Sequence, residues 1–548
     1  MVLKTKLVSS LEKTFTVAGV KEEGTNKASA LKGEIYSFQL ACFLEDNSAE
    51  RRSHFTIEIE SELKDYINYY IVKEIPVRLP AFQVSDDYYI SKEAGLYPDV
   101  LEKAPWKEVT LTVNNWKSFW FEVNVPENIK AGIYPITVTL KKGDFEKSET
   151  FTLEVIDAVI PKQDLICTHW FHYDCLATWY KTPVFSEEHW EIVENYIKAY
   201  RKYGSNMILT PVITPALDTD VGSERPTAQL VDITFENGEY SFGFDKLTRF
   251  IDLAHKYGIE YFEIAHLFTQ WGAAFAPKVV NTKGNKLFGW ETKANSEEYK
   301  YFLKCFLTAL KAYLKDKGVL DKCYFHISDE PNDSHLENYK SAKDSVIDII
   351  GDCHMMDALS HYEFYDMGLV KTPVCATNAI EPFIENKVED LWAYYCCGQG
   401  NKNVSNGFIA MPSARTRILG LQLFKYDIKG FLQWGYNYWY SEHSRYEIDP
   451  YFTADGDETW PAGDPFLVYP GFDKNPVLSL RLLVFNEAIQ DLRALKLLAS
   501  YMGHEETTKW LEKLSGQEIT FSNYPKGRKY LLYIREEINK KIREYAAK

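Results

Sequence analysis

Short apolar runs alternate with amphipathic segments of helical period across the middle of this 548-residue chain, and this alternation limits the possible folds. Helical segments lie between most of these runs; in one of them Trp190, Val193 and Ile197 share a face after a capping Ser186. Eight runs have the length and apolar character of buried strands: 165–168, 207–209, 259–264, 323–327, 353–356, 373–376, 391–396 and 430–434. Strands that alternate with helices in this way predict a (β/α)8 barrel. An open doubly wound sheet is less favoured because no glycine-rich phosphate-binding turn follows the first run.

The regions before and after this middle part show other periods of apolar residues. Apolar and polar residues alternate with period two at 121–125, 136–140 and 151–155, as in half-buried antiparallel strands. The last region is dominated by helical patterns. We therefore predict an α/β multidomain chain: an antiparallel β-sandwich over 1–160, a catalytic (β/α)8 TIM barrel over 161–475, and a mainly helical C-terminal segment over 476–548 that packs on the barrel.

Charge and cysteine content exclude several partners. The chain has 62 Lys and Arg against 78 Asp and Glu, a formal charge of −16, which argues against nucleic acid and anionic membranes as partners. Nine cysteines without a C-x-x-C pair indicate reduced thiols in a cytoplasmic protein. The N-terminus shows no uninterrupted apolar signal region, although secretion stays open if a leader was removed. The sequence gives no oligomeric state.

Two adjacent carboxylates mark the predicted catalytic site. Active sites of such barrels lie at the C-terminal ends of the strands, and Asp329 and Glu330 follow the fourth predicted strand. Neighbouring strand ends carry mostly aromatic residues, whose amphipathic rings suit the faces of sugars. The predicted substrate-binding residues at these ends are His266, Trp271, Tyr395, Trp434, Asn437 and Trp439. The alternative is that Asp329 and Glu330 have no catalytic role and are simply acidic residues that precede a helix.

This pair suits one particular hydrolytic mechanism. We assign Glu330, the longer side chain, as the general acid, since a neighbouring negative charge helps one carboxyl group of such a pair to keep its proton. A retaining glycosidase commonly needs a second carboxylate about 5 Å away across the sugar, which Asp329 does not easily reach. In substrate-assisted hydrolysis the 2-acetamido oxygen of the sugar attacks instead, and Asp329 is suited to orient that group.

Two other functions stay open. A two-carboxylate retaining glycosidase would use Glu330 with Glu381 or Glu442 as nucleophile, and a carbohydrate-binding protein would use the site without catalysis. We predict no cofactor and no metal, because no ligand set has metal spacing. The acidic loop 455–458 lacks the spaced oxygens of a calcium loop, and whether it binds a cation is left open.

Several segments together resemble glycoside hydrolase family 123, the β-N-acetylgalactosaminidases and relatives that share their catalytic domain. They are VPENIKAGIYPITVTL (125–140), YFEIAHLFTQWG (261–272), HISDEPND (326–333), GFLQWGYNYWY (430–440), GDPFLVYPG (463–471) and SLRLLVFNEAIQDLRAL (479–495). The resemblance implies a β-sandwich before a barrel, retention of configuration, and an Asp–Glu pair at Asp329 and Glu330. It also implies a glycan partner that carries β-linked N-acetylgalactosamine, with the gluco epimer as the alternative.

Overall fold

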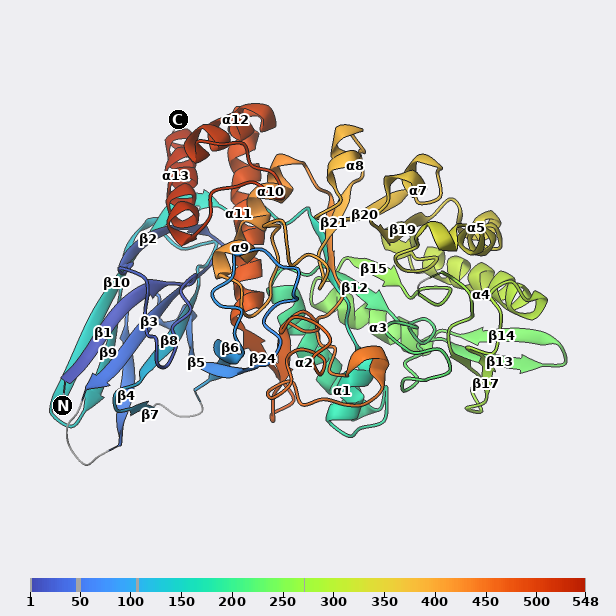
Figure 1. Cartoon of the computed structure of the whole chain (residues 1–548), viewed down its shortest axis with the longest axis horizontal. Helices are drawn as coiled ribbons and strands as arrows, with labels where there is room; N and C mark the ends of the chain where they lie inside the picture. The colour runs from blue at the N-terminus through green and yellow to red at the C-terminus, as the bar shows by residue number, and fades with distance from the viewer. Residues whose placement is uncertain (1, 46–50, 105–107, 271, 548) are drawn as a thin grey trace.

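The computed structural model describes residues 2–45, 51–104, 108–270 and 272–547, and it has a β-sandwich on one side and a barrel on the other (Figure 1). The larger sandwich sheet has the order β1 (Val2–Ser9), β3 (Ile35–Glu45), β8 (Trp116–Asn124), β5 (Ile67–Val77), β6 (Gly95–Lys103), β24 (Pro476–Ser479) and β23 (Val468–Pro470). The smaller sheet has the order β2 (Lys27–Lys32), β10 (Phe145–Val159), β9 (Gly132–Lys142), β4 (Arg52–Glu60) and β7 (Glu108–Thr112).

Aromatic residues from both sheets fill the space between them. Phe38 of one sheet stacks on Phe121 of its own sheet and on Phe151 of the other, the latter with ring centroids 4.3 Å apart. The sandwich is therefore as predicted, with two differences. β2 pairs with β10 in parallel, and β24 and β23, from the other end of the chain, extend the larger sheet at β6.

Eight parallel strands form the barrel, as the sequence predicts. They are β11 (Ile166–His169), β12 (Met207–Thr210), β15 (Tyr261–Ile264), β18 (Cys323–Phe325), β19 (His354–Leu359), β20 (Thr372–Ala376), β21 (Trp392–Tyr394) and β22 (Gly430–Gln433). The sheet runs in chain order from β12 to β22 and returns to β11. Asn206 holds the seam between β11 and β12, since its backbone N–H donates to the carbonyl of Cys167 and its side chain accepts from the N–H of Cys167. The barrel is thus nearly closed.

The helices around the barrel are uneven in length. Long helices cover the first half, and two of them are capped by serines that accept a backbone N–H: Ser186, as predicted, and Ser296. The connections after β19, β20 and β21 hold only short helices. The set is α1 (Tyr173–Trp179), α2 (Glu187–Lys202), α3 (Asp245–Lys256), α4 (Glu297–Asp316), α5 (Leu336–Asp344), α6 (Ile347–Ile350), α7 (Tyr362–Asp366), α8 (Glu381–Glu385), α9 (Ser413–Arg417) and α10 (Leu419–Lys425).

Smaller elements complete the connections. Two hairpins lie outside the barrel, β13 (Asp232–Glu236) with β14 (Glu239–Gly243) and β16 (Val279–Val280) with β17 (Lys286–Phe288). Single 3-10 turns are η1 (Lys64–Tyr66), η2 (Leu320–Lys322), η3 (Asp333–His335) and η4 (Glu442–Ser444).

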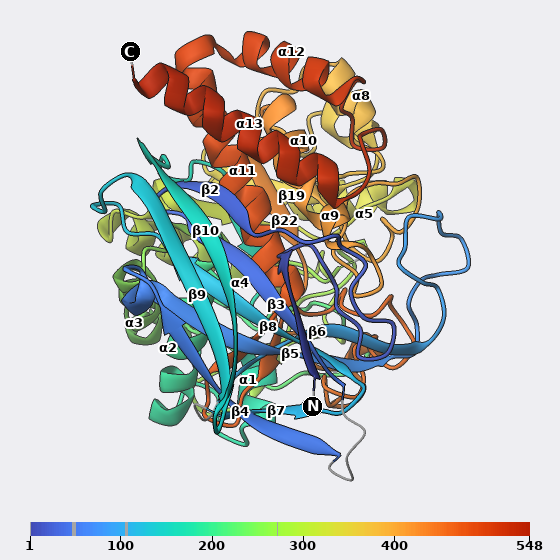
Figure 2. The ribbon, with the colours of Figure 1, turned by 90° about the vertical axis from the view of Figure 1, so that its left-hand side faces the viewer.

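Three C-terminal helices join the barrel to the sandwich. They are α11 (Leu480–Met502), α12 (His504–Ser515) and α13 (Arg528–Ala546). α11 packs on α9 and α10 at the barrel, while α13 lies along β2 and β10 of the sandwich (Figure 2). Asp491 of α11 accepts hydrogen bonds from both Arg417 and Arg535, and Arg535 also pairs with Glu34 of the sandwich. The segment therefore packs on both domains. No helix within the described ranges is long and apolar enough to cross a membrane.

Candidate active site

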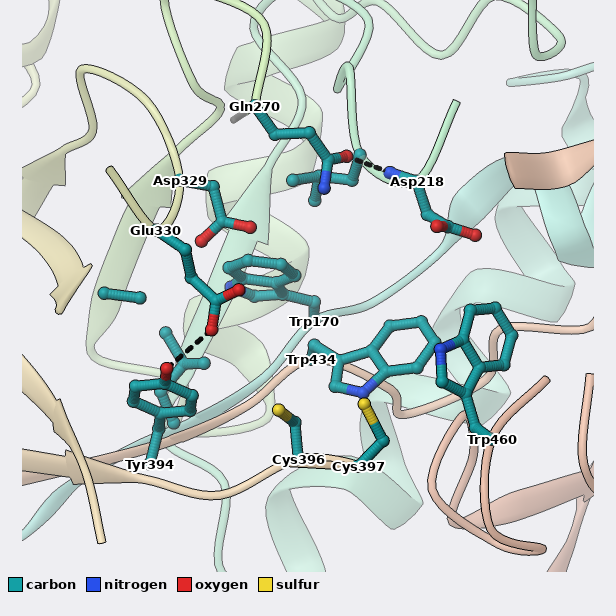
Figure 3. Close-up of a pocket in the computed structure, with 13 residues that line it drawn as sticks. Trp170, Asp218, Gln270, Asp329, Glu330, Tyr394, Cys396, Cys397, Trp434 and Trp460 are labelled. Carbon is teal, nitrogen blue, oxygen red and sulfur yellow. Dashed lines mark hydrogen bonds between the residues drawn. The ribbon is translucent and has the colours of Figure 1, made fainter. Parts of the chain in front are cut away.

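A pocket opens where the barrel strands end, and both predicted catalytic carboxylates line it (Figure 3). Loops that follow β11, β12, β15, β18, β21 and β22 supply most of its wall. The lining residues are Trp170, Leu217, Asp218, Gln270, Asp329, Glu330, Ala358, Tyr394, Cys396, Cys397, Leu432, Trp434 and Trp460. The wall combines carboxylates with large aromatic rings, as expected for a sugar site.

An unusual backbone conformation at Glu330 lets both carboxylates face this pocket. Consecutive side chains of an extended segment point to opposite sides. Glu330 has a φ of 42°, in the left-handed region that residues other than glycine seldom adopt, and the carboxyl groups of Asp329 and Glu330 both point into the pocket (Figure 3). The hydroxyl of Tyr394 donates to Oε1 of Glu330 over 2.5 Å and fixes its carboxyl group.

The electrostatics of the pair favour a retained proton. Asp329 is 6% exposed, and burial together with the charge of Glu330 raises its pKa well above the usual range, against an opposing effect of His326. From the sequence we expect the proton on Glu330. In the structure the pKa that rises is that of Asp329, and the proton of two interacting carboxyl groups belongs to the pair.

A buried histidine, His326, lies near Asp329 and Glu330. Nε2–H of His326 donates to Glu263 over 2.7 Å, and Nδ1–H donates to Asp357 over 3.0 Å. Burial alone would lower the pKa of His326, but these two carboxylates outweigh burial and raise it to about 10. Glu263 also accepts the indole N–H of Trp170 over 2.7 Å, which fixes this ring in the pocket wall.

His266 belongs to this network rather than to the pocket lining. Its ring stacks on His326 with centroids 4.1 Å apart and an angle of 21°, and the edge of Trp170 meets it at 5.3 Å. Ligand atoms of His266, His326 and Asp357 lie within 4.8 Å of one another. However, His326 gives both of its N–H groups to carboxylates, and nearly parallel rings do not direct their in-plane lone pairs at one ion. The geometry favours an ion-pair network over a metal site.

Among the predicted binding residues that the structure describes, Trp434 is the one that lines the pocket. Its indole N–H donates to Oδ2 of Asp464 over 2.9 Å, and its ring meets Trp460 edge to face at 5.0 Å. Asp464 is 2% exposed, and burial raises its pKa to about 7. Its other oxygen has no hydrogen-bond partner among the described residues. Trp434 and Trp460 together form an aromatic wall next to the pair (Figure 3).

Three other predicted binding residues lie outside the pocket lining. Tyr395 is buried in the core, because side chains alternate along the strand and it is Tyr394 that faces the pocket. Asn437 is fully buried and exchanges two hydrogen bonds with a backbone segment, and Trp439 is buried and donates its indole N–H to a backbone carbonyl. Neither belongs to the pocket lining. Trp271 lies outside the described residues.

The structure also shows the two candidate nucleophiles of a two-carboxylate glycosidase, Glu381 and Glu442, and the acidic loop 455–458. Glu381 is exposed at the start of α8, and Glu442 pairs with Arg445 over 3.1 Å; neither lines the pocket. In the acidic loop 455–458, Arg78 supplies positive charge to Asp455 and Asp457 at 3.0 and 2.9 Å.

Several lining residues escaped the sequence analysis. Asp218 and Gln270 lie in long loops, where the sequence has no periodic pattern that would mark them. The end of a predicted strand, by contrast, carries Tyr394, Cys396 and Cys397, which could have been predicted from their position. Asp218 is a further carboxylate of the wall; burial raises its pKa, and it accepts the backbone N–H of residue 443 over 3.0 Å.

Comparisons with known proteins bear on the fold and the family of this chain. A family 123 glycoside hydrolase from Clostridium perfringens, whose structural description concerns glycolipid glycan hydrolysis, superposes with a TM-score of 0.75 at 17% identity over 100% of this chain and 99% of that one. A β-glucuronidase from Bacteroides uniformis (12% identity, TM-score 0.30) aligns with 82% of this chain and 48% of its own. A family 5 glycoside hydrolase from Bacteroides vulgatus (13%, TM-score 0.30) aligns with 59% and 67%. No curated protein sequence matches. The family model described as glycoside hydrolase 123, catalytic domain, matches residues 170–498, more than half of the chain, so the chain belongs to glycoside hydrolase family 123.

Proposed function

We propose that this glycoside hydrolase removes terminal β-linked N-acetylgalactosamine, or a related N-acetylhexosamine, by a retaining, substrate-assisted mechanism. The observation that carries the proposal is the consecutive pair Asp329 and Glu330, which presents two carboxyl groups on one side of a single pocket. Two carboxylates on the same side of a sugar leave the opposite face to a nucleophile that the substrate itself supplies.

The first step uses the shared proton. Asp329 accepts the N–H of the bound acetamido group and leaves the proton of the pair on Glu330. Glu330 gives this proton to the glycosidic oxygen while the acetamido oxygen attacks the anomeric carbon. The leaving alcohol departs, and the negative charge of Asp329 stabilises the oxazolinium that has formed.

The second step reverses these roles. Glu330 takes a proton from water, the water attacks the anomeric carbon from the face that the alcohol left, and the oxazoline opens with net retention. Tyr394 holds Glu330 in place for both steps through its 2.5 Å hydrogen bond. Trp434 and Trp460 offer apolar faces to the sugar ring, and the formal charge of −16 favours a neutral glycan over a polyanionic one.

Substitution of Glu330 tests the proposal. Glu330→Gln should lower turnover of N-acetylhexosaminides with poor leaving groups by about 10²–10⁴-fold and affect aryl substrates with good leaving groups less, because only the former need protonation. Glu381→Gln, at an exposed glutamate away from the pocket, is the matched control and should keep wild-type turnover. Full activity of Glu330→Gln on a poor leaving group would end the assignment.

Asp218 supports one competing mechanism. It is a further carboxylate of the pocket wall and lies across the pocket from Glu330 in Figure 3, so it is the candidate nucleophile of a two-carboxylate glycosidase. That mechanism requires hydrolysis of sugars without an acetamido group and its loss in Asp218→Asn. Saccharide binding without hydrolysis would instead identify a binding protein.

A further inference from the structure

Two consecutive cysteines lie in the wall of the catalytic pocket, next to the residues of the proposed reaction. Cys396 and Cys397 follow β21, both are half-buried, and both line the pocket. Their thiol groups extend toward the pocket on the side of Glu330 and Trp434 (Figure 3). The reaction proposed above uses neither sulfur.

Hydrogen bonds hold this dipeptide rigidly. The N–H of Cys396 donates to Gln399 over 2.8 Å, and its carbonyl accepts from Asn406 over 2.8 Å. The backbone of Cys397 also lies close enough to the carboxyl group of Asp464 to influence its pKa, and Asp464 is the residue that anchors Trp434. A chemical modification of either sulfur therefore alters a part of the pocket wall whose backbone is held in place by hydrogen bonds.

The two thiols also interact with each other. The neighbouring thiol of Cys397, burial and the nearby charge of Glu330 raise the pKa of Cys396 well above its usual range. A raised pKa disfavours the thiolate of Cys396, so we take Cys397 as the first nucleophile and Cys396 as the second.

We propose that Cys396 and Cys397 form a redox-sensitive modification site, at which a low-molecular-weight disulfide of the glutathione class reversibly closes the catalytic pocket. The inference goes beyond the proposed function and does not depend on which sugar is cleaved.

The chemistry is a two-step thiol–disulfide exchange. Cys397 loses its proton and its sulfur attacks one sulfur of the small disulfide, which breaks the S–S bond and releases one small thiol that takes up a proton. Cys396 then loses its proton and attacks the Cys397 sulfur of the mixed disulfide, which releases the second small thiol. The two cysteines give up two electrons in total, and the small disulfide accepts them.

The bond between consecutive cysteines is readily reversed. Consecutive Cα atoms are about 3.8 Å apart, whereas the Cα atoms of ordinary disulfides are about 4.4–6.8 Å apart. A vicinal disulfide is therefore strained and easily reduced, as labile regulatory disulfides are. The mixed disulfide places a tripeptide in the pocket, and the vicinal disulfide draws both sulfurs together in the wall beside Glu330. Both forms hinder entry of the sugar.

The test treats the full chain with oxidised glutathione, removes the reagent and measures kcat/KM before and after addition of dithiothreitol, with each variant compared with its own untreated sample. Wild type should lose at least about tenfold in kcat/KM and recover on reduction. Cys397→Ser should keep its untreated value, and Cys396→Ser should retain glutathione on Cys397 until it is reduced. Cys353→Ser, at a half-buried cysteine away from the pocket, is the matched control and should respond like wild type.

Peptide mass mapping gives a second readout that needs no activity. It should find a disulfide or a glutathione adduct at residues 396 and 397 of the treated wild type. An unmodified dipeptide, a modified dipeptide with unchanged kcat/KM, or equal inactivation of Cys397→Ser would each overturn the proposal. An enzyme inactive on every acetamido sugar would refute the proposed function, and the mapping would still decide whether the site exists.

Discussion

Replacement of His326 by glutamine removes the cation from the buried network behind the catalytic pair. The side chain is 1% exposed and lies between Glu263 and Asp357, so the change leaves two carboxylates without their shared partner. Loss of one partner from a buried ion pair costs about 3–5 kcal/mol. A rise in pKa from 6.5 to about 10 corresponds to about 5 kcal/mol, in agreement with this range.

The sign of the pH effect follows from the same pKa. Because the pKa of His326 is higher in the folded chain than in the unfolded one, its contribution to stability is complete below about pH 6.5. This contribution is lost as the pH rises through about 10. Wild type should therefore lose stability between pH 6.5 and pH 10.

Urea denaturation followed by circular dichroism measures both effects. At pH 6.5, His326→Gln should lower the free energy of unfolding by about 3–5 kcal/mol. The double variant Glu263→Gln with His326→Gln should recover part of that loss, since it removes one unpaired carboxylate. His255→Gln, at an exposed histidine on α3, should stay within about 0.5 kcal/mol of wild type. A loss below about 1 kcal/mol in His326→Gln, or a wild-type stability that is constant from pH 6.5 to pH 10, would refute the assigned charge.

Further predictions concern the pocket wall. Tyr394→Phe removes a hydrogen bond to the carboxyl group of Glu330 worth about 1.5–3 kcal/mol, so kcat/KM should fall by about 10–100-fold; an unchanged value would show that the bond does not serve catalysis. Asp464 ionises near pH 7, and the ionised form holds the Trp434 indole more firmly, so KM should fall as the pH rises through 7. Asp464→Asn should lack this dependence, and the same KM profile in both proteins would contradict the role of Asp464.

The sequence was sufficient for the barrel because buried parallel strands carry short apolar runs that are visible without structure. The two adjacent carboxylates of the pocket were visible too, since Asp329 and Glu330 directly follow such a run. The assignment of Tyr395 missed the lining residue Tyr394 by one position, and a one-residue shift moves a side chain to the other face of a strand.

Other features depend on distant parts of the chain. Glu263, His326 and Asp357 lie on or next to three different strands, and only the register of the barrel brings them together. β24 is four residues long and has no strong pattern of its own, so its pairing with β6 could not be predicted. The left-handed conformation of Glu330 has no signal in its residue type.

The central claim is that the substrate supplies the nucleophile and that Asp329 and Glu330 act on it together. The most direct measurement compares kcat/KM of one preparation on aryl β-N-acetylgalactosaminide, aryl β-N-acetylglucosaminide and aryl β-galactoside. The account predicts hydrolysis of the two acetamido sugars, with the galacto epimer preferred, and no hydrolysis of the plain galactoside. Comparable hydrolysis of the plain galactoside, abolished by Asp218→Asn, would contradict it.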